Sequence, residues 1–265
     1  MVSQLHATLE RQGTSKTVLV LLHGFPIDSR MWDPMIAHLD PRWTVVTVDL
    51  PGLGRSHRTL PEPPSLATSA QLVYCAVQNL VGGDDQKIVI AGLSMGGYVA
   101  ASILCDFPGW PTAVVLMDTK GAADTEEQRA KRISIAEIAE RDASADVVMG
   151  QAKGMLSPLT LEQNPQTLHK LESLIASQMG IGVAWSQRAM ADRPDTTKVL
   201  NQIDLPALVV VGSDDSITPT EGMSSLAASM KNAQFVQVNG AGHMAPFEQP
   251  GVVAQALDTF LSGIA

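Results

Sequence analysis

The chain has 265 residues, of which 45% are hydrophobic and 17% charged, so it can bury a substantial core and is not of a disordered composition. Its formal net charge is −9 and its Lys and Arg residues do not cluster, which argues against nucleic acid or an anionic membrane as a partner. Since there is neither an apolar leader at the N-terminus nor a long apolar stretch, we expect a cytoplasmic protein that does not span a membrane.

Six apolar, largely β-branched runs are expected to form strands, and they begin at Thr17, Thr44, Lys87, Ala113, Pro206 and Gln234. Most are continuously hydrophobic rather than alternating, as required in a mostly parallel sheet that is covered on both faces. Helix-like stretches separate them. The last such stretch carries one apolar face, formed by Val252, Val253, Ala256, Leu257, Phe260 and Leu261. This alternation predicts a doubly wound α/β fold.

The stretch from residue 120 to residue 197 contains no strand-like run. Thr125 and Gln128 have the spacing of a capping box, and further helix-like pieces follow. A helical insertion between two strands most simply forms a lid over the carboxyl ends of the sheet, where open α/β sheets bind ligands. We therefore expect a core of residues 1–119 and 198–265 and a lid of residues 120–197. The alternative is a second helical layer without a functional role.

A Gly-x-Ser-x-Gly motif centred on Ser94 stands between the third of these runs and a helix-like stretch. A turn from strand to helix within one residue strains the serine backbone, and small neighbours such as Gly92 and Gly96 permit it. The serine hydroxyl then lies beside the free N–H groups of the new helix. The same motif occurs in ordinary glycine-rich turns, but its place after a strong strand favours a nucleophile.

Two further motifs follow strands in the order that such a site needs. His23-Gly-Phe-Pro comes after the first run, and His243 comes after the last one. A pair of aspartates, Asp214 and Asp215, follows the run that begins at Pro206. The chain therefore has its serine, its acid and its histidine in the order found in α/β-hydrolases.

Five segments together carry a resemblance to a known family: HGFP (23–26), DLPGLGRS (49–56), GLSMGG (92–97), VVVGSDDSITP (209–219) and GAGHMAPFEQP (240–250). With them the chain resembles the α/β-hydrolase superfamily, and in particular the bacterial group of small carboxylesterases, enol-lactonases and cofactor-free haloperoxidase-like enzymes. The set is specific for the fold and much less so for the substrate.

The resemblance implies a role for each motif residue. Ser94 would be the nucleophile and His243 its general base. The family pattern G-x-x-D-x-x-x-P fits Asp215 rather than Asp214, so Asp215 is expected to orient the histidine. The backbone N–H groups of Phe25 and Met95 would stabilise the oxyanion. His23 would shape the loop that carries Phe25.

These roles predict a serine esterase that cleaves small carboxylic esters or lactones through an acyl-enzyme without a cofactor. A serine at position 94 argues against the dehalogenase and epoxide-hydrolase branches, which attack with a carboxylate. Three alternatives stay open: a C–C bond hydrolase, a perhydrolase, or a signalling receptor of this fold that binds a small ligand beneath the lid.

Candidates for an apolar substrate pocket are Trp32, Met155, Trp185 and Met244, although each residue by itself is more typical of an ordinary core. The histidines are scattered, and neither His-Glu-x-x-His nor Cys-x-x-Cys occurs, so no metal site is expected. Cys75 and Cys105 lie in apolar, helix-like stretches and are expected to be small buried thiols in a reducing compartment, with a disulfide as the alternative. The expected partner is a small-molecule ester or lactone; nothing in the sequence indicates an oligomeric state.

Overall fold

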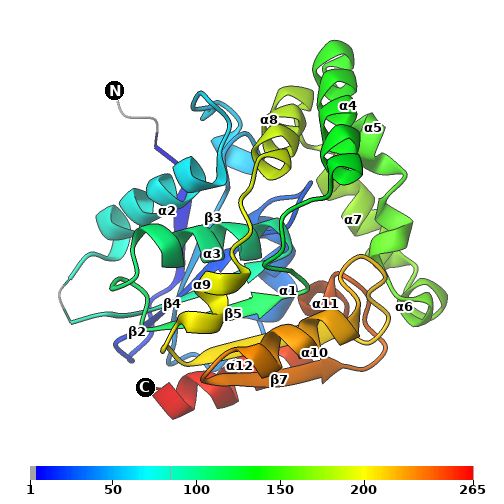
Figure 1. Ribbon diagram of the computed structural model, residues 1–265. Coiled ribbons are helices and arrows are strands. Elements are labelled where there is room, and N and C mark those ends of the chain that lie inside the picture. Colours follow the sequence, from blue (N-terminus) through cyan, green and yellow to red (C-terminus); the bar gives the residue numbers. More distant parts are fainter. Residues whose placement is uncertain (1–3, 84, 265) are drawn as a thin grey trace.

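One seven-stranded sheet forms the centre of the computed structural model, which describes residues 4–83 and 85–264 (Figure 1). The strand order is β1-β3-β2-β4-β5-β6-β7, and every neighbouring pair is parallel except β1 with β3. The strands are β1 (Ala7–Arg11), β2 (Thr17–Leu22), β3 (Thr44–Val48), β4 (Lys87–Leu93), β5 (Ala113–Met117), β6 (Ala207–Gly212) and β7 (Ala233–Val238). The mostly parallel sheet expected from the apolar runs is confirmed.

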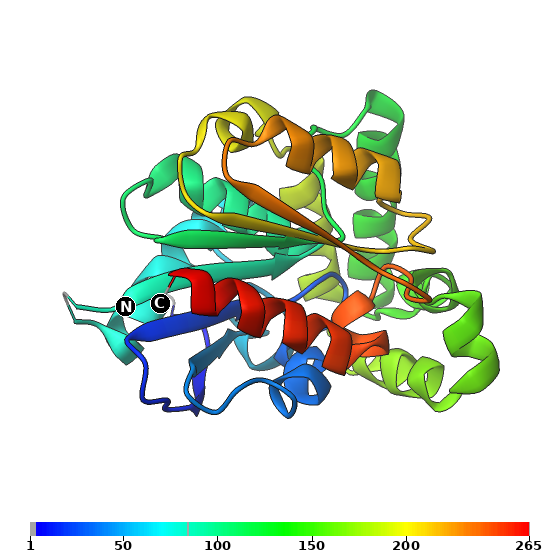
Figure 2. The same ribbon diagram turned by 90° about the horizontal axis from the view of Figure 1, so that it is seen from below.

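Helices cover both faces of this sheet, which explains why the residues of β2, β3, β5 and β6 are buried throughout. The helices that flank the sheet are α1 (Asp33–Ile36), α2 (Leu66–Val81), α3 (Met95–Asp106), α9 (Thr197–Gln202), α10 (Thr220–Ser229), α11 (Ala245–Glu248) and α12 (Pro250–Ile264). Figure 2 shows α10 and α12 on opposite sides of the sheet. On α12 the expected apolar face is buried at Val253, Leu257, Phe260 and Leu261, whereas Val252 is exposed.

The strand β1 was not expected from the sequence. It lies at the edge of the sheet, and its pattern of exposure is mixed because only β3 pairs with it. Its residues Ala7–Arg11 include Glu10 and Arg11, so it lacks the continuous apolar run that marks the central strands. Charged side chains of this kind are common on edge strands, where they oppose pairing with other chains.

The segment between β5 and β6 is helical, as expected. It contains α4 (Glu126–Asp142), α5 (Asp146–Met149), α6 (Pro158–Gln163), α7 (Gln166–Ala176) and α8 (Gly180–Ala191), followed by α9. The capping box at the start of α4 is formed: Gln128 N–H donates to Thr125 Oγ1 at 3.2 Å, and Thr125 N–H donates to Gln128 Oε1 at 3.1 Å. The helices α4 to α8 gather at one end of the sheet (Figure 1).

Two further features concern the surface. In the described part of the chain, no helix combines the length and the apolar character needed to cross a membrane. Cys75 is half-buried and Cys105 is exposed, contrary to expectation, and both thiols are free. Cys75 lies outside the buried side of α2, and Cys105 stands at the C-terminal end of α3, after ten residues that are all buried. An apolar helical segment therefore did not ensure burial of its cysteine.

Candidate active site

A sharp turn between β4 and α3 positions Ser94. Its backbone has φ 52° and ψ −112°, a strained conformation for a residue with a side chain. A Cβ atom at Gly92 would lie 2.2 Å from the carbonyl oxygen of Gly96, and one at Gly96 would lie 2.1 Å from that of Leu22. Because both contacts are far too short, the turn requires glycine at both positions, as the motif predicted.

The structure brings Ser94, His243 and Asp215 together from the loops after β4, β7 and β6. Ser94 Oγ lies 2.9 Å from His243 Nε2, and His243 Nδ1 lies 2.9 Å from Asp215 Oδ2. Since a carboxylate accepts hydrogen bonds, we assign the ring proton to Nδ1, which leaves Nε2 as an acceptor for the serine hydroxyl. This arrangement suits removal of the hydroxyl proton by the imidazole.

Asp215 is held in place by its own loop. Its Oδ1 accepts the N–H groups of Ile217 at 2.8 Å and Thr218 at 3.0 Å, while its Oδ2 accepts the Thr218 hydroxyl as well as His243. Burial acts to raise the pKa of this carboxyl, but the hydrogen bonds and the charge of His243 outweigh it and lower the pKa. Asp214 is exposed, and its carboxylate accepts only the Ser213 hydroxyl among the described residues.

The loop after β2 approaches the serine closely. A Cβ atom at Gly24 would lie 3.6 Å from Ser94 Cβ, and Phe25 lines the same cavity as Ser94. The N–H groups of Phe25 and Met95 donate to no acceptor within residues 4–83 and 85–264, so both are free to bind an oxyanion. Met95 is also the first residue of α3, where the helix dipole favours negative charge.

His23 is fully buried beneath this loop and does not contact Ser94. Its Nε2 accepts the N–H of Leu50 at 2.9 Å, so its Nδ1 carries the proton and donates to the carbonyl of Gly24 at 2.8 Å. Both ring nitrogens therefore bind backbone. This geometry suits a structural histidine and leaves neither ring nitrogen available as a base.

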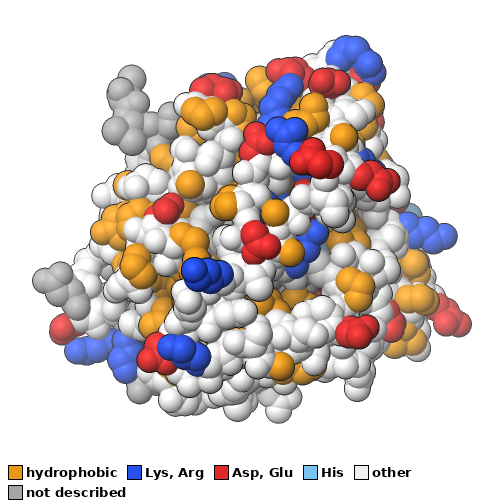
Figure 3. Space-filling view, viewed as in Figure 1, with side chains coloured by type: hydrophobic (Ala, Val, Ile, Leu, Met, Phe, Trp, Pro, Cys, Tyr) orange, Lys and Arg blue, Asp and Glu red, His pale blue; other side chains and the backbone are white. Residues whose placement is uncertain are grey.

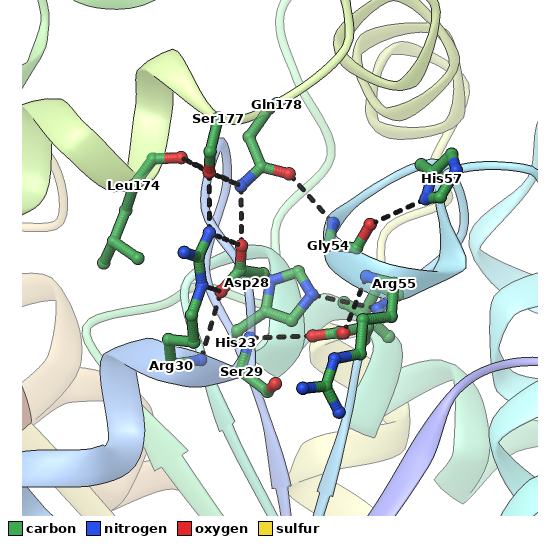
Figure 4. Close-up of polar contacts among 12 residues, drawn as sticks. His23, Asp28, Ser29, Arg30, Gly54, Arg55, His57, Leu174, Ser177 and Gln178 are labelled. Atoms are coloured by element: carbon green, nitrogen blue, oxygen red, sulfur yellow. Dashed lines mark hydrogen bonds and ion pairs between the residues drawn. The ribbon is translucent and has the colours of Figure 1, made fainter.

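A second polar network ties the same loop to the helical insertion (Figure 4). The buried Asp28 carboxylate accepts Arg30 Nη2 at 2.6 Å and Gln178 Nε2 at 2.7 Å, and Gln178 Oε1 accepts the N–H of Gly54 at 2.9 Å. Burial acts to raise the pKa of Asp28, but the hydrogen bonds from Arg30 and Gln178 outweigh it, so the pKa is lowered. Gln178 thus joins the insertion to two loops of the core.

Ser94 and His243 open into a cavity of about 470 Å³. The insertion forms much of its wall through Lys120, Asp124, Gln128, Lys131, Arg132, Ile135, Gln151, Gly154, Met155, Gln187 and Met190. Among the four expected pocket residues, Met155 lines this cavity. Trp32 and Met244 are fully buried in the core, and Trp185 Nε1 donates to the carbonyl of Pro61 at 2.7 Å. None of these three is among the residues that form the cavity wall.

Two features of the site were missed by sequence reasoning. One is the charged character of the cavity wall, since helical spacing alone did not reveal which residues of the insertion face Ser94. The other is Asp118, which directly follows β5, is fully buried and accepts the N–H of Gly212 at 2.8 Å. Burial, and then the charge of Asp215, raise the pKa of Asp118 well above its usual range. Its position directly after an apolar, strand-like run is the sequence feature that could have identified Asp118 as part of the site.

A sequence profile described as the alpha/beta hydrolase family matches residues 19–256. The chain belongs to the alpha/beta hydrolase family. This hydrolase is similar to a solved thermophilic esterase from Thermogutta terrifontis, described with malate bound, with 32% identity, a TM-score of 0.91 and coverage of 98% of this chain and 94% of that one. The enol-lactonase from Burkholderia xenovorans LB400 shares the fold, with 22% identity, a TM-score of 0.82 and coverage of 97% and 96%.

Among relatives known by sequence, this hydrolase is 24% identical over 254 residues to a pimeloyl-[acyl-carrier protein] methyl ester esterase from Legionella pneumophila. That match covers 92% of this chain and 94% of the relative. The fold is also shared with BpoC of Mycobacterium tuberculosis, which is described as a non-heme bromoperoxidase. That match has 20% identity and a TM-score of 0.81, and it covers 100% of this chain and 98% of that one. This hydrolase therefore belongs with the bacterial esterase and haloperoxidase-like group that its motifs resemble.

Proposed function

We propose that this α/β-hydrolase is a serine esterase that cleaves small carboxylic esters or lactones through an acyl-enzyme on Ser94. The observation that carries the proposal is the pair of 2.9 Å hydrogen bonds that runs from Ser94 through His243 to Asp215 at the end of a cavity. Action on ester bonds is supported by its relatives, which are named esterase, methyl ester esterase and enol-lactonase.

In the acylation step, His243 Nε2 removes the proton of Ser94 as its Oγ attacks the ester carbonyl. The imidazolium that forms is stabilised by the Asp215 carboxylate, whose lowered pKa keeps it ionised. The negative charge on the carbonyl oxygen is bound by the N–H groups of Phe25 and Met95. His243 then protonates the leaving alkoxide, and the acyl group stays on Ser94.

In the second half of the reaction, the same groups act on water. His243 removes a proton from a water molecule that attacks the acyl-enzyme, and it returns the proton to Ser94 Oγ as the acid leaves. In a lactone the alcohol and the acid belong to one molecule, so the ring opens and the released hydroxyl stays attached to the acyl chain. Apart from the ester and one water molecule, the groups of this mechanism are all residues of the chain.

The cavity and the insertion support a small substrate. A volume of about 470 Å³ lies in the lower part of the range for ligand sites in proteins. We propose that residues 120–197 act as a lid, because Met155, Ile135 and Met190 from this segment form part of the apolar wall of the cavity that holds Ser94. These side chains would then limit the length of the acyl group.

The proposal is tested by labelling with a fluorophosphonate probe and by hydrolysis of p-nitrophenyl esters of increasing acyl length. We expect one labelled site, Ser94, and multiple turnovers on the short esters. Ser94→Ala should abolish both while the thermal midpoint stays near that of the wild type. The exposed Ser225 on α10 provides the matched control, since Ser225→Ala should keep both activities. Turnover that survives Ser94→Ala, or a single slow turnover typical of a receptor, would contradict the proposal.

A further inference from the structure

The wall of the cavity next to Ser94 is rich in positive charge, although the chain as a whole has a net charge of −9. Lys120, Lys131 and Arg132 line it, and Asp124 is the one acidic residue among the described residues that form the wall. Figure 3 shows that the outer surface over α4 and α8 carries Lys and Arg side chains interspersed with Asp and Glu, so the excess of cations belongs to the cavity wall. The local excess of cations calls for a physical explanation.

Asp124 stands at the centre of this charge cluster. Its side chain is 1% exposed, and it forms ion pairs with Arg132, with Arg193 Nη1 at 2.8 Å and with Lys120 Nζ at 3.4 Å. One carboxylate balances only one of the three cations. The cluster therefore retains about two positive charges at a largely buried place, where uncompensated charge is costly.

The three cations differ in what else they contact. Arg193 is buried, donates to the carbonyls of Met190 and Ala122, and lies 4.2 Å above the ring of Tyr98, so its role is structural. Lys120 has Asp124 as its one ion-pair partner in the described chain, and its side chain is 31% exposed. Burial, and then the charge of Arg193, lower the pKa of Lys120, so an additional anion beside it would be favourable.

This cluster lies close to the serine. The N–H of Tyr98, whose ring lies beneath Arg193, donates to the carbonyl of Ser94 at 3.2 Å, so the Tyr98 backbone is about one helical turn, or about 6 Å along the axis, from Ser94. Lys120 directly follows Thr119, whose Oγ1 donates to the same carbonyl at 2.8 Å. A substrate bound at Ser94 would need only a short chain to reach Lys120 and Arg132, the two cations of this cluster that line the cavity.

We propose that Lys120 and Arg132 bind a carboxylate carried by the substrate, so that the preferred substrates are esters or lactones with a free carboxylate a few bonds from the scissile carbonyl. Arg132 Nε donates to Asp124, and its Nη1 donates to Gln187 Oε1 and Met190 Sδ, whereas its Nη2 donates to no acceptor in the described part of the chain. A carboxylate suits the site because one of its oxygens can accept from Arg132 Nη2 while the other accepts from Lys120 Nζ. Because a carboxylate adds only one negative charge, it can bind here while Asp124 keeps its own ion pairs. This inference rests on the proposed esterase function and specifies its substrate class.

The test compares monomethyl glutarate, which carries a free carboxylate, with dimethyl glutarate, whose rate is divided by two for its two equivalent ester bonds. For the wild type we expect kcat/KM to be about 10-fold or more higher for the monoanion, the effect of one hydrogen bond between charged groups. In Lys120→Met this ratio should fall toward one. Lys170→Met, an equal change of charge at an exposed position on α7 outside the cavity, should keep the wild-type ratio.

A second pair of substrates locates the carboxylate within the ester. The acetyl ester of 3-hydroxypropionate, compared with propyl acetate, carries the charge on the alcohol side, whereas monomethyl glutarate carries it on the acyl side. A preference for the charged member of either pair that depends on Lys120 supports the proposal and identifies the side. Equal rates within both pairs would overturn it, and so would competitive inhibition by inorganic phosphate but not by glutarate.

Binding measurements separate this inference from the proposed esterase function. Calorimetry of glutarate with Ser94→Ala should detect binding that weakens about 10-fold in the Ser94→Ala, Lys120→Met double variant. If Lys120→Met does not fold, Lys120→Gln replaces it, because its amide can still donate to Asp124 while the positive charge is removed. Hydrolysis of neutral esters without a charge preference would overturn the carboxylate site alone. Absence of labelling at Ser94 would overturn the esterase function. The calorimetric measurement of glutarate binding would still test the carboxylate site by itself.

Discussion

Asp118 and Asp215 are neighbouring buried acids: Asp118 accepts the N–H of Gly212, three residues before Asp215, and its pKa is raised by burial and then by the charge of Asp215. Two neighbouring carboxyl groups do not ionise independently, because like charges repel strongly where water is excluded. Asp215 receives hydrogen bonds from His243 and Thr218, which favour its anion, whereas Asp118 Oδ2 has no partner in the described chain. We therefore expect Asp118 to keep its proton at a pH where Asp215 is ionised, and to donate it toward Asp215.

Replacing Asp118 by asparagine tests this relationship through the pH dependence of stability. Burial and the charge of Asp215 raise the pKa of Asp118 in the folded state, so the folded chain binds more protons than the unfolded one above about pH 3.8, its usual pKa. The free energy of unfolding of the wild type then falls as pH rises from there to the raised pKa. Asp118→Asn removes this loss, so the variant should gain stability over the wild type as pH rises. Thermal midpoints of both proteins between about pH 4 and pH 9 measure it.

Asp118→Ala serves as the control for this experiment. Asparagine can still accept the N–H of Gly212 and donate to Asp215, whereas alanine leaves that buried N–H without its acceptor. The alanine variant should lose about 1–3 kcal/mol of stability relative to Asp118→Asn at every pH. If the stability curves of wild type and Asp118→Asn ran parallel across the whole range, Asp118 would titrate normally and the shared-proton interpretation would be wrong.

The two adjacent aspartates are expected to differ sharply in their effect on catalysis. Asp215→Asn places an amide against His243 Nδ1 and favours the tautomer that cannot accept the serine proton. In serine proteases the equivalent change lowers kcat by about 10⁴-fold, and a loss of that order is expected here. Asp214→Asn changes an exposed side chain and should leave kcat within about 2-fold, as surface substitutions usually do. Steady-state kinetics on one p-nitrophenyl ester compares the two variants directly. If Asp214→Asn showed the large loss of kcat instead, the assignment of Asp215 as the acid that orients His243 would be wrong.

Because the pKa of Asp215 is lowered in the folded state, the free energy of unfolding is expected to fall at acid pH. Burial acts to raise its pKa, yet the hydrogen bonds from His243 and Thr218 outweigh it, so the folded pKa lies below 3.8. The stabilisation from this carboxylate is therefore complete above its unfolded pKa and is lost as pH falls through the folded pKa. In Asp215→Asn that loss should be absent, which thermal midpoints below about pH 4 would detect as a shallower decline than in the wild type.

The sequence predicted most of the sheet because the central strands are buried on both faces and so are apolar throughout. It did not predict β1, because this edge strand pairs with one neighbour only and is partly exposed, so it can include the charged residues Glu10 and Arg11. Ser94, His243 and the aspartate pair were predicted because they follow strands in a fixed order, and the family pattern favoured Asp215 over Asp214. The structure places Ser94 within hydrogen-bond distance of His243, and His243 within hydrogen-bond distance of Asp215. The charged cavity wall was not found, since Lys120 and Arg132 reach the site through the packing of the insertion rather than through a motif.

Met155 and Trp185 were expected to act alike, but the structure separates them. Met155 lines the cavity, so Met155→Ala should enlarge it and shift the preference toward longer acyl chains, with a loss of about 2–5 kcal/mol in stability. Trp185 lies outside the cavity wall and donates to the carbonyl of Pro61, so Trp185→Phe should cost about 1 kcal/mol without changing the ranking of esters. Rates on a p-nitrophenyl ester series, measured beside thermal midpoints, separate the effects. A changed ranking in Trp185→Phe alone would contradict this division.

The network around Asp28 leads to a prediction about the oxyanion site (Figure 4). Gln178 bonds both to Asp28 and to the N–H of Gly54, and Asp28 follows Phe25 by three residues in the same loop. Gln178→Ala removes both bonds, so the loop that carries the Phe25 N–H should lose part of its support. Ser177→Ala is the matched control, because Ser177 is the neighbouring residue and its hydroxyl accepts only the exposed Arg30 side chain and the Gln178 amide.

Stability and reactivity together decide the role of Gln178. We expect Gln178→Ala to cost about 1–3 kcal/mol, because it leaves polar groups of Asp28 and Gly54 without partners, and Ser177→Ala to stay within about 0.5 kcal/mol of the wild type. Removal of one oxyanion donor costs about 10²–10³ in kcat in other hydrolases. A donor that is displaced rather than removed should cost less, so we expect the rate of fluorophosphonate labelling in Gln178→Ala to fall about 10-fold. If the thermal midpoint fell while the labelling rate stayed unchanged, Gln178 would support the fold without positioning Phe25.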